Sequence, residues 1–249
     1  MDTPTSREGR ETVAAALELG LGLIDTAREY AGSEHLIGDV IRAMGRRDAY
    51  LATKTFSRTA DGCQWDVDRS LRALGVDVID LYQLHDVSRP EVLAQVLAEG
   101  GALEGLRTAQ YRGLVRHVGV SCHSLEVARD AVVSGEFDAI MLEYSAFYPD
   151  SAPIIALAAE RDVAVIVMRP LGGSGRTSVI RGRVADGTAG VLTPANLLRY
   201  VLSNPAVSVA IPGARYPSRV HENLETSASF EPMDEGMRAE LEAAAQGLY

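Results

Sequence analysis

Short apolar runs alternate with amphipathic segments along most of the chain. Seven of these runs are bounded by turn residues and are rich in apolar residues that favour strands. The predicted strands are 23–27, 50–55, 78–85, 115–121, 139–145, 163–169 and 207–213. Between them, apolar residues recur with the period of a helix, and several of these segments end in glycine. Ser124 and Thr193 are predicted N-caps.

The order of these elements predicts the fold class. Strict alternation of strand and helix favours parallel strands joined by right-handed crossovers, and eight such units close a barrel of about 250 residues. Because the chain has 249 residues, we expect a single domain, 1–249. The polar segment 1–10 contains Pro4, so no strand is predicted before the first helix. The pattern allows an α/β barrel of the (β/α)8 TIM type without its first strand, or an open doubly wound sheet.

One predicted connection is long. Segment 172–192 is rich in Gly, Ser, Thr and Arg. Loops of this length are usually lids or disordered segments, so we expect a long loop here.

Composition narrows the classes of function. The net charge is −10 without a concentrated basic patch, and 6% of the residues are aromatic, so we expect no binding to nucleic acid. No apolar run approaches the roughly 18 residues that span a bilayer, and the first residues are too polar for a signal peptide, so we expect no membrane role. Cys63 and Cys122 do not make a disulfide framework, which favours a cytoplasmic location.

The chain contains a single lysine, Lys54, among 24 Lys and Arg residues. Asp25, Lys54 and His85 lie near the ends of consecutive predicted strands. Tyr30 follows in the loop after the first of these strands. The carboxyl ends of neighbouring parallel strands meet at one rim, so we expect the four side chains to converge there. Free tyrosine has a pKa of about 10, and a nearby ammonium lowers it, so the four groups predict a phenol that donates a proton.

Five runs carry a family resemblance, and they are LIDTAREYAGSEHLIG, LATKT, LYQLHD, VRHVGVSCH and VAIPGARYPSRVHENL. In this order and spacing the chain resembles the aldo-keto reductases over nearly its whole length. The resemblance implies a (β/α)8 barrel that reduces a small-molecule carbonyl with NADPH or NADH. It also implies that Tyr30 is the proton donor, that Lys54 and Asp25 tune it, and that His85 orients the substrate carbonyl.

The resemblance also implies a set of cofactor-binding residues. These are Ser121, Arg169, Leu171, Gly173, Arg219, Glu222 and Asn223. The chain departs from the family pattern at Cys122, where Asn is usual, at Met141, where Gln is common, and at Gly213, where a basic residue is frequent. Preference between NADPH and NADH therefore stays open, with Arg215 or Arg219 as candidates for contact with a 2′-phosphate.

Members of the family normally begin with a hairpin and a first barrel strand, and neither is predicted in this sequence. Loss of that strand exposes two sheet edges, which favour pairing with another segment or another chain. We therefore expect that a homo-oligomer could form through an unpaired strand edge.

Three other interpretations compete with a reductase. A family-like protein without redox activity could act as a binding or regulatory subunit. Lys54 could form a Schiff base as in an aldolase, but that chemistry needs a neutral amine, which Asp25 opposes. His117, Cys122 and His123 resemble a metal cluster, but alternation along a strand points His117 and Cys122 to opposite faces, so no metal site is expected.

Overall fold

The computed structural model describes residues 7–45 and 49–248. All seven predicted strands are present, each within its predicted range. The strands are β1 (Leu23–Asp25), β2 (Tyr50–Thr55), β3 (Ile79–Leu84), β4 (Val115–Ser121), β5 (Ala139–Glu143), β6 (Ala164–Met168) and β7 (Val209–Ile211). Alternation of apolar runs with turn residues was therefore sufficient to find the sheet.

Helices lie between the strands as the apolar period predicts. In the first half of the chain they are α1 (Arg7–Glu18), α2 (Ser33–Met44), α3 (Ala60–Leu74), α4 (Pro90–Leu97), α5 (Ala102–Tyr111) and α6 (Leu125–Ser134). In the second half they are the 3₁₀ turn η1 (Pro149–Ser151), α7 (Ala152–Glu160), α8 (Ser174–Ala185), α9 (Pro194–Leu202), α10 (Pro217–Ala228) and α11 (Glu235–Gln246). The hydroxyls of Ser124 and Thr193 accept hydrogen bonds from Val127 N and Asn196 N, so both predicted N-caps are confirmed.

The expectation of a long loop over 172–192 is wrong. Twelve of these residues form α8, of which Ile180 is the buried member. A helix that buries so little lacks the apolar stripe by which a surface helix is found in a sequence. The composition, rich in Gly and Ser, therefore led us to predict a loop where the chain forms a helix that is mostly exposed.

The strands follow one another in the sheet in chain order, from β1 to β7. Leu23 pairs with Tyr50, Ala52 with Leu81, and Leu81 with His117, all in parallel register. A doubly wound sheet has a point at which the strand order reverses. Consecutive order without a reversal therefore favours the (β/α)8-type barrel over the doubly wound alternative.

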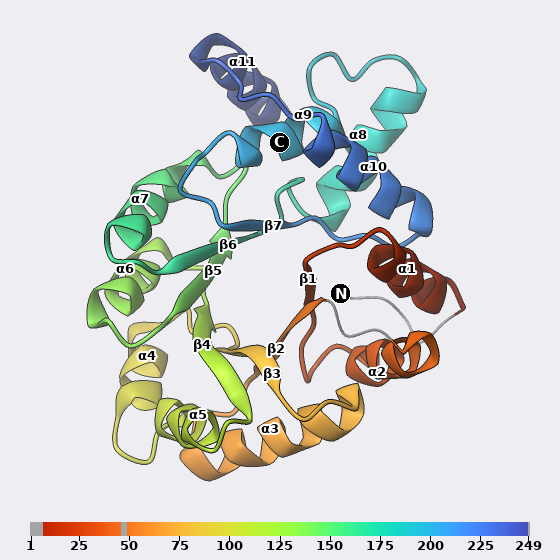
Figure 1. Ribbon diagram of the computed structural model, residues 1–249. Coiled ribbons are helices and arrows are strands. Elements are labelled where there is room, and N and C mark those ends of the chain that lie inside the picture. The colour runs from red at the N-terminus through yellow and green to blue at the C-terminus, as the bar shows by residue number, and fades with distance from the viewer. Residues whose placement is uncertain (1–6, 46–48, 249) are drawn as a thin grey trace. The chain divides into compact units, whose positions relative to one another are not determined.

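The chain falls into two compact units. The first comprises residues 1–140 and 213–220, and the second comprises 141–212 and 221–249. In the first unit, α1, α2, α3 and α5 cover one face of strands β1 to β4 (Figure 1). Its core contains fully buried side chains from both layers, among them Ile37, Leu74, Ile79, Leu84 and Leu106.

In the second unit, a pair of buried tyrosines anchors the C-terminal helix. Arg238 Nη2 of α11 donates to the hydroxyl of Tyr144 at 2.7 Å, and the Tyr200 hydroxyl of α9 donates to Glu242 Oε1 at 2.5 Å. The Arg238 guanidinium also lies 4.4 Å from the centroid of the Tyr200 ring. These contacts attach α11 to α9 and to the residue that follows β5.

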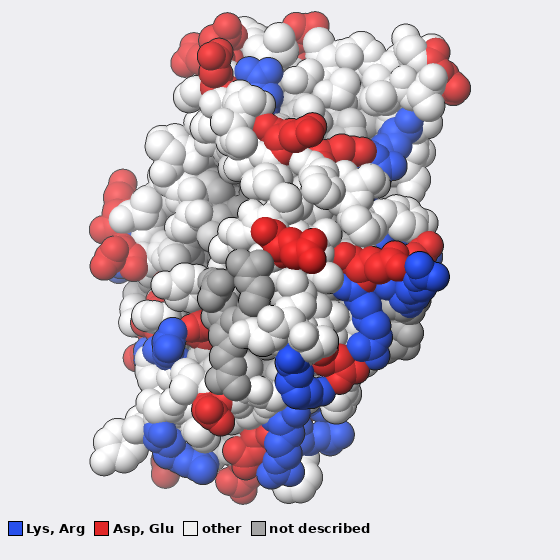
Figure 2. All heavy atoms as spheres, turned by 45° about the vertical axis from the view of Figure 1, so that its right-hand side comes forward, with Lys and Arg blue, Asp and Glu red and all other residues white. Residues whose placement is uncertain are grey.

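The surface of α1 and α2 carries opposite charges in contact. Arg10 Nη2 and Arg42 Nη2 lie 2.9 Å and 2.5 Å from the two carboxylate oxygens of Asp39. Basic and acidic side chains are mixed on the face that Figure 2 shows. Exposed pairs of this kind contribute at most about 1 kcal/mol each, so packing rather than surface charge holds these helices. Within the described ranges, no helix is long and apolar enough to cross a membrane.

Gly38 gives a direct test of the packing of α2 on the end of α3. A Cβ at this position would lie 2.3 Å from Ala73 O and 2.7 Å from Leu74 O, and backbone oxygens cannot move aside cheaply. We expect Gly38→Ala to lower the free energy of unfolding by about 1–3 kcal/mol, measured by urea denaturation. Gly182→Ala in α8 is the matched control, because its Cβ would meet nothing within 4 Å and alanine favours helix. Equal effects of the two substitutions would contradict this close approach.

Candidate active site

A buried ion pair joins the carboxyl ends of β1 and β2. Lys54 Nζ lies 2.6 Å from Asp25 Oδ2 and donates to Thr26 O at 2.8 Å. The side chain of Lys54 is 1% exposed and that of Asp25 is 8% exposed. Charges taken out of water this far are stable only when they are paired and hydrogen-bonded, as these are.

The strand register explains why these residues meet. Asp25 pairs with Ala52, and Lys54 pairs with Gln83. Side chains of paired residues share a face, and so do residues two apart on one strand. Asp25, Lys54 and Gln83 therefore project from the same face, and His85 continues that face just beyond β3.

Tyr30 reaches this rim because the loop after β1 stays attached to β2. Thr26 N donates to Ala52 O at 2.8 Å, and Arg28 N donates to Lys54 O at 3.0 Å. Gly32 then takes a positive φ of 75° before α2 begins. The Tyr30 ring consequently lies with its centroid 5.2 Å from Lys54 Nζ.

Polar contacts beneath the loop fix it in place. Arg28 Nη1 lies 2.5 Å from Glu34 Oε2, and the buried Glu34 also accepts a hydrogen bond from Thr53 Oγ1 at 2.7 Å. The Thr26 hydroxyl donates to Ser33 Oγ at 2.8 Å. The loop that carries Tyr30 is thus tied to both α2 and β2. Glu34, in the first turn of a predicted helix, gave no sign in the sequence that it would be buried.

His85 completes the cluster of predicted catalytic residues. Its ring centroid lies 5.8 Å from that of Tyr30, with the two planes at 82°. Phe56 stacks on the His85 ring at 4.2 Å and 16°, and Glu29 Oε2 lies 3.2 Å from His85 Nδ1. Sequence reasoning missed Phe56 and Glu29. The available signal was that Phe56 follows Lys54 by two residues and that Glu29 directly precedes Tyr30 in the sequence.

Two further residues at this rim form hydrogen bonds, Gln83 with a charged side chain and Ser121 with the main chain. Gln83 is fully buried, and its Nε2 donates to Asp25 Oδ1 at 3.4 Å. Ser121, a predicted cofactor residue at the end of β4, accepts a hydrogen bond on Oγ from Asp86 N at 2.9 Å. Asp86 has a positive φ of 51°, so the Ser121 hydroxyl holds a tight turn directly after His85.

In the second unit, Arg169, Leu171 and Gly173 lie in the turn after β6. Arg169 has a φ of 52°, and its Nη1 lies 2.9 Å from Glu143 Oε1. Leu171 is buried, and its carbonyl accepts a hydrogen bond from Thr177 Oγ1 at 3.1 Å. Gly173, with a φ of 88°, precedes the first turn of α8 without capping it through a side chain. The three residues therefore form one turn at the start of a helix.

The other predicted cofactor residues lie on α10. Arg219, Glu222 and Asn223 are three and four residues apart, so they share one side of that helix. Arg181 Nη1 of α8 lies 2.9 Å from Glu222 Oε2. Glu222 thus links α8 to α10.

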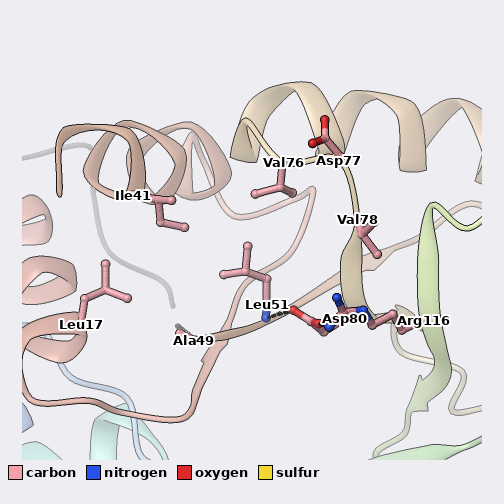
Figure 3. Close-up of a pocket in the computed structure, with 9 residues that line it drawn as sticks. All are labelled: Leu17, Ile41, Ala49, Leu51, Val76, Asp77, Val78, Asp80 and Arg116. Atoms are coloured by element: carbon pink, nitrogen blue, oxygen red, sulfur yellow. Dashed lines mark hydrogen bonds and ion pairs between the residues drawn. The ribbon is translucent and has the colours of Figure 1, made fainter. Parts of the chain in front are cut away.

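A cavity of about 220 Å³ lies at the amino ends of the strands, opposite the carboxyl ends that carry Asp25 and Lys54 (Figure 3). Residues near the starts of β2, β3 and β4 line this cavity together with residues of α1 and α2, and the lining includes Leu17, Ile41, Leu51 and Asp80. Both oxygens of Asp80 are engaged, by Leu51 N at 2.9 Å and by Arg116 Nη1 at 2.6 Å. Catalytic groups of parallel barrels lie at the carboxyl ends, so we do not assign the substrate to this cavity.

Within the described part of the chain, no group of three or more His, Cys, Asp or Glu side chains is placed to hold a metal ion. The His117 side chain is 63% exposed, whereas Cys122 is buried and donates from Sγ to Ser124 O at 3.1 Å. Burial raises the pKa of the Cys63 thiol to about 12 and also raises that of Cys122. Both thiols therefore stay protonated at neutral pH, in the form that binds metals poorly.

The pair of Lys54 and Asp25 can be tested by stability alone. Lys54→Met leaves a buried carboxylate without its cation, so we expect the free energy of unfolding to fall by about 3–5 kcal/mol in urea denaturation. Asp25→Asn should cost a similar amount, and the double variant should cost clearly less than the sum of the two. Strictly additive losses would show that the two charges do not depend on each other.

Comparisons with known proteins agree with this fold. Residues 2–183 match the model of the aldo/keto reductase family. The chain is 25% identical to the uncharacterized oxidoreductase YqkF of Bacillus subtilis, over 94% of this chain and 87% of the relative. It is 32% identical to an aldo-keto reductase of Mycobacterium avium, over 89% of this chain and 76% of the relative.

A solved structure shares the fold. The aldo-keto reductase of Klebsiella pneumoniae in complex with NADPH superposes with a TM-score of 0.72 at 24% identity, covering 96% of this chain and 86% of the other. This likeness confirms a (β/α)8-type barrel. On the family model and the sequence relatives, the chain belongs to the aldo/keto reductase family of oxidoreductases.

Proposed function

We propose that this chain reduces an aldehyde or ketone to an alcohol with a nicotinamide cofactor, NADPH or alternatively NADH. Tyr30 is the proton donor, Lys54 and Asp25 tune it, and His85 orients the carbonyl. The observation that carries the proposal is the ammonium of Lys54, buried beside Asp25 and 5.2 Å from the centroid of the Tyr30 ring. A buried positive charge beside a phenol favours the phenolate and so eases loss of its proton.

The roles of these side chains follow from the reaction. When bound, a reduced nicotinamide would supply a hydride to the carbonyl carbon. As the C=O π bond breaks, its electron pair moves to the oxygen, which takes the proton of Tyr30. Lys54 stabilises the phenolate that remains, while Asp25 and Thr26 O hold the ammonium in place. General acid catalysis of this kind contributes about 100- to 10,000-fold to rate.

The same ion pair argues against a Schiff-base mechanism. A lysine nucleophile must be neutral and is usually activated by burial or by a neighbouring cation. Lys54 instead has a carboxylate at 2.6 Å, which stabilises the charged amine. Membership of an oxidoreductase family likewise argues against a purely regulatory subunit.

We propose that the turn after β6 binds the phosphates of the cofactor and that residues of α10 bind its adenosine end. Gly173 leaves the first turn of α8 without a side-chain cap, and backbone amides at such a helix start suit an anion. Arg169, Leu171 and Gly173 would hold the cofactor there, and Arg219, Glu222 and Asn223 would hold its adenosine end. Arg219 or Arg215 would take the place of the basic residue that Gly213 replaces, so we propose NADPH as the preferred form.

Partners follow from the same proposal. The substrate is a small carbonyl compound, and neither nucleic acid nor membrane is expected. Within the order from β1 to β7, the first and last strands stand at the two ends. Association of two chains through such an edge stays a prediction, as does a cytoplasmic location.

Tyr30→Phe tests the assignment of the proton donor. Without the hydroxyl we expect kcat for carbonyl reduction to fall at least about 100-fold, while the affinity for NADPH stays near that of the parent. Turnover is followed by nicotinamide absorbance on a panel of aldehydes and ketones, and affinity by quenching of protein fluorescence. Tyr111→Phe is the matched control, because that side chain is 94% exposed on α5. Unchanged turnover in Tyr30→Phe would exclude Tyr30, and no binding of either NADPH or NADH by the parent would contradict the reductase.

A further inference from the structure

The His85 ring is held on three sides in the first unit. Phe56 stacks on one face at 4.2 Å, and Tyr30 meets the ring edge-on at 5.8 Å. Glu29 Oε2 lies 3.2 Å from Nδ1. The main chain of His85 is fixed as well, because Arg58 Nη2 donates to its carbonyl at 2.6 Å. The ring therefore has one orientation in which stacking and the carboxylate contact are both kept.

Glu29 is ionised in this setting. Partial burial by itself would raise the pKa of Glu29, but hydrogen bonds from His85 and from Phe56 N at 3.1 Å outweigh it and lower the pKa below its ordinary value. An ionised carboxylate only accepts hydrogen bonds. The proton between Glu29 and His85 therefore belongs to Nδ1 of the imidazole.

This assignment decides what the other ring nitrogen can do. A neutral imidazole carries one proton, so with Nδ1 protonated its Nε2 is an acceptor. The oxygen of a substrate carbonyl is also an acceptor, and two acceptors cannot form a hydrogen bond. Nε2 can donate to a carbonyl only when the ring carries both protons.

We propose that Glu29 is a positioning residue that makes His85 act as an imidazolium during carbonyl reduction. This inference rests on the proposed function, which assigns His85 to the carbonyl oxygen. His85 keeps both of its protons in the step and donates a hydrogen bond from Nε2, while Tyr30 gives up its proton. In the neutral ring, Nε2 accepts a hydrogen bond from the hydroxyl of an alcohol, which suits the reverse oxidation.

Other ionisable groups lie at the same rim: Tyr30 against the His85 ring, Lys54 with its partner Asp25 beside Tyr30, and Arg58 and Asp86 along the main chain. Lys54 and Asp25 offset each other as an ion pair. Arg58 contacts the backbone oxygens of His85 and Asp86, on the main-chain side of the ring. The Asp86 carboxylate accepts a hydrogen bond from the Ser88 hydroxyl. Of these charged groups, Glu29 is the one whose contact is with a ring nitrogen.

The protonation of His85 can be measured without any substrate. We expect long-range ¹H–¹⁵N NMR of the parent to show the neutral His85 with its proton on Nδ1, and His85→Gln identifies its signals among the five histidines. Glu29→Gln keeps an acceptor but removes the charge, so the titration midpoint of His85 should fall by about one pH unit or more. Glu126→Gln, at an exposed position of α6, removes the same charge elsewhere and should leave the midpoint unchanged.

Kinetics provide the second readout. For the parent, kcat/KM of carbonyl reduction should fall as pH rises through the His85 midpoint. For Glu29→Gln this fall should begin about one pH unit lower, so that above the parental midpoint the variant is about 10-fold slower. At acid pH, where both rings are charged, the two enzymes should be similar. A purely structural role of Glu29 would lower the rate at every pH without moving the profile.

The two proposals fail in different ways. No carbonyl reduction by the parent with either nicotinamide would overturn the proposed function, and with it the imidazolium role in catalysis. An active parent whose neutral His85 carries its proton on Nε2 would overturn the inference about Glu29 alone. Identical midpoints and pH profiles for the parent and Glu29→Gln would do the same.

Discussion

The buried contact between Lys54 and Asp25 is the constraint on which the rest of this rim depends. Taking a carboxylate and an ammonium out of water costs several kcal/mol for each ion, so each requires the other and further polar partners. Thr26 O and Gln83 supply those partners. A sheet that slipped by one residue between β1 and β2 would place one charge on the opposite face. The pair therefore makes the strand register and the chemistry of the site depend on each other.

The pair also sets the electrostatics of its neighbours. The two ions add no net charge to the rim. The ammonium of Lys54 faces the Tyr30 ring, however, and the carboxylate of Asp25 faces Gln83. Glu29 has a similar relation to His85 a short distance away. The phenol of Tyr30 thus lies beside the ammonium of Lys54, and the imidazole of His85 lies beside the carboxylate of Glu29. Such paired environments let neighbouring residues play different roles at one pH.

Much of this arrangement could be predicted from the sequence, for physical reasons. Strands were found because buried runs are apolar, and Asp25, Lys54 and His85 were found because polar residues at strand ends break those runs. The convergence of these residues then followed from parallel pairing. The helix α8 was missed because it buries little more than Ile180. Glu29 and Phe56 were missed because their contacts with His85 depend on side-chain directions across three loops, which no local period encodes.

In the short loop between β1 and α2, three adjacent residues each make a different contact. Arg28 anchors it to Glu34, Glu29 contacts His85, and Tyr30 lies beside Lys54. Natural variation in one of these positions would alter the setting of the other two, so they should be inherited as a block. Recombination between homologous reductases would then best keep this loop, β2 and the start of α2 from a single parent.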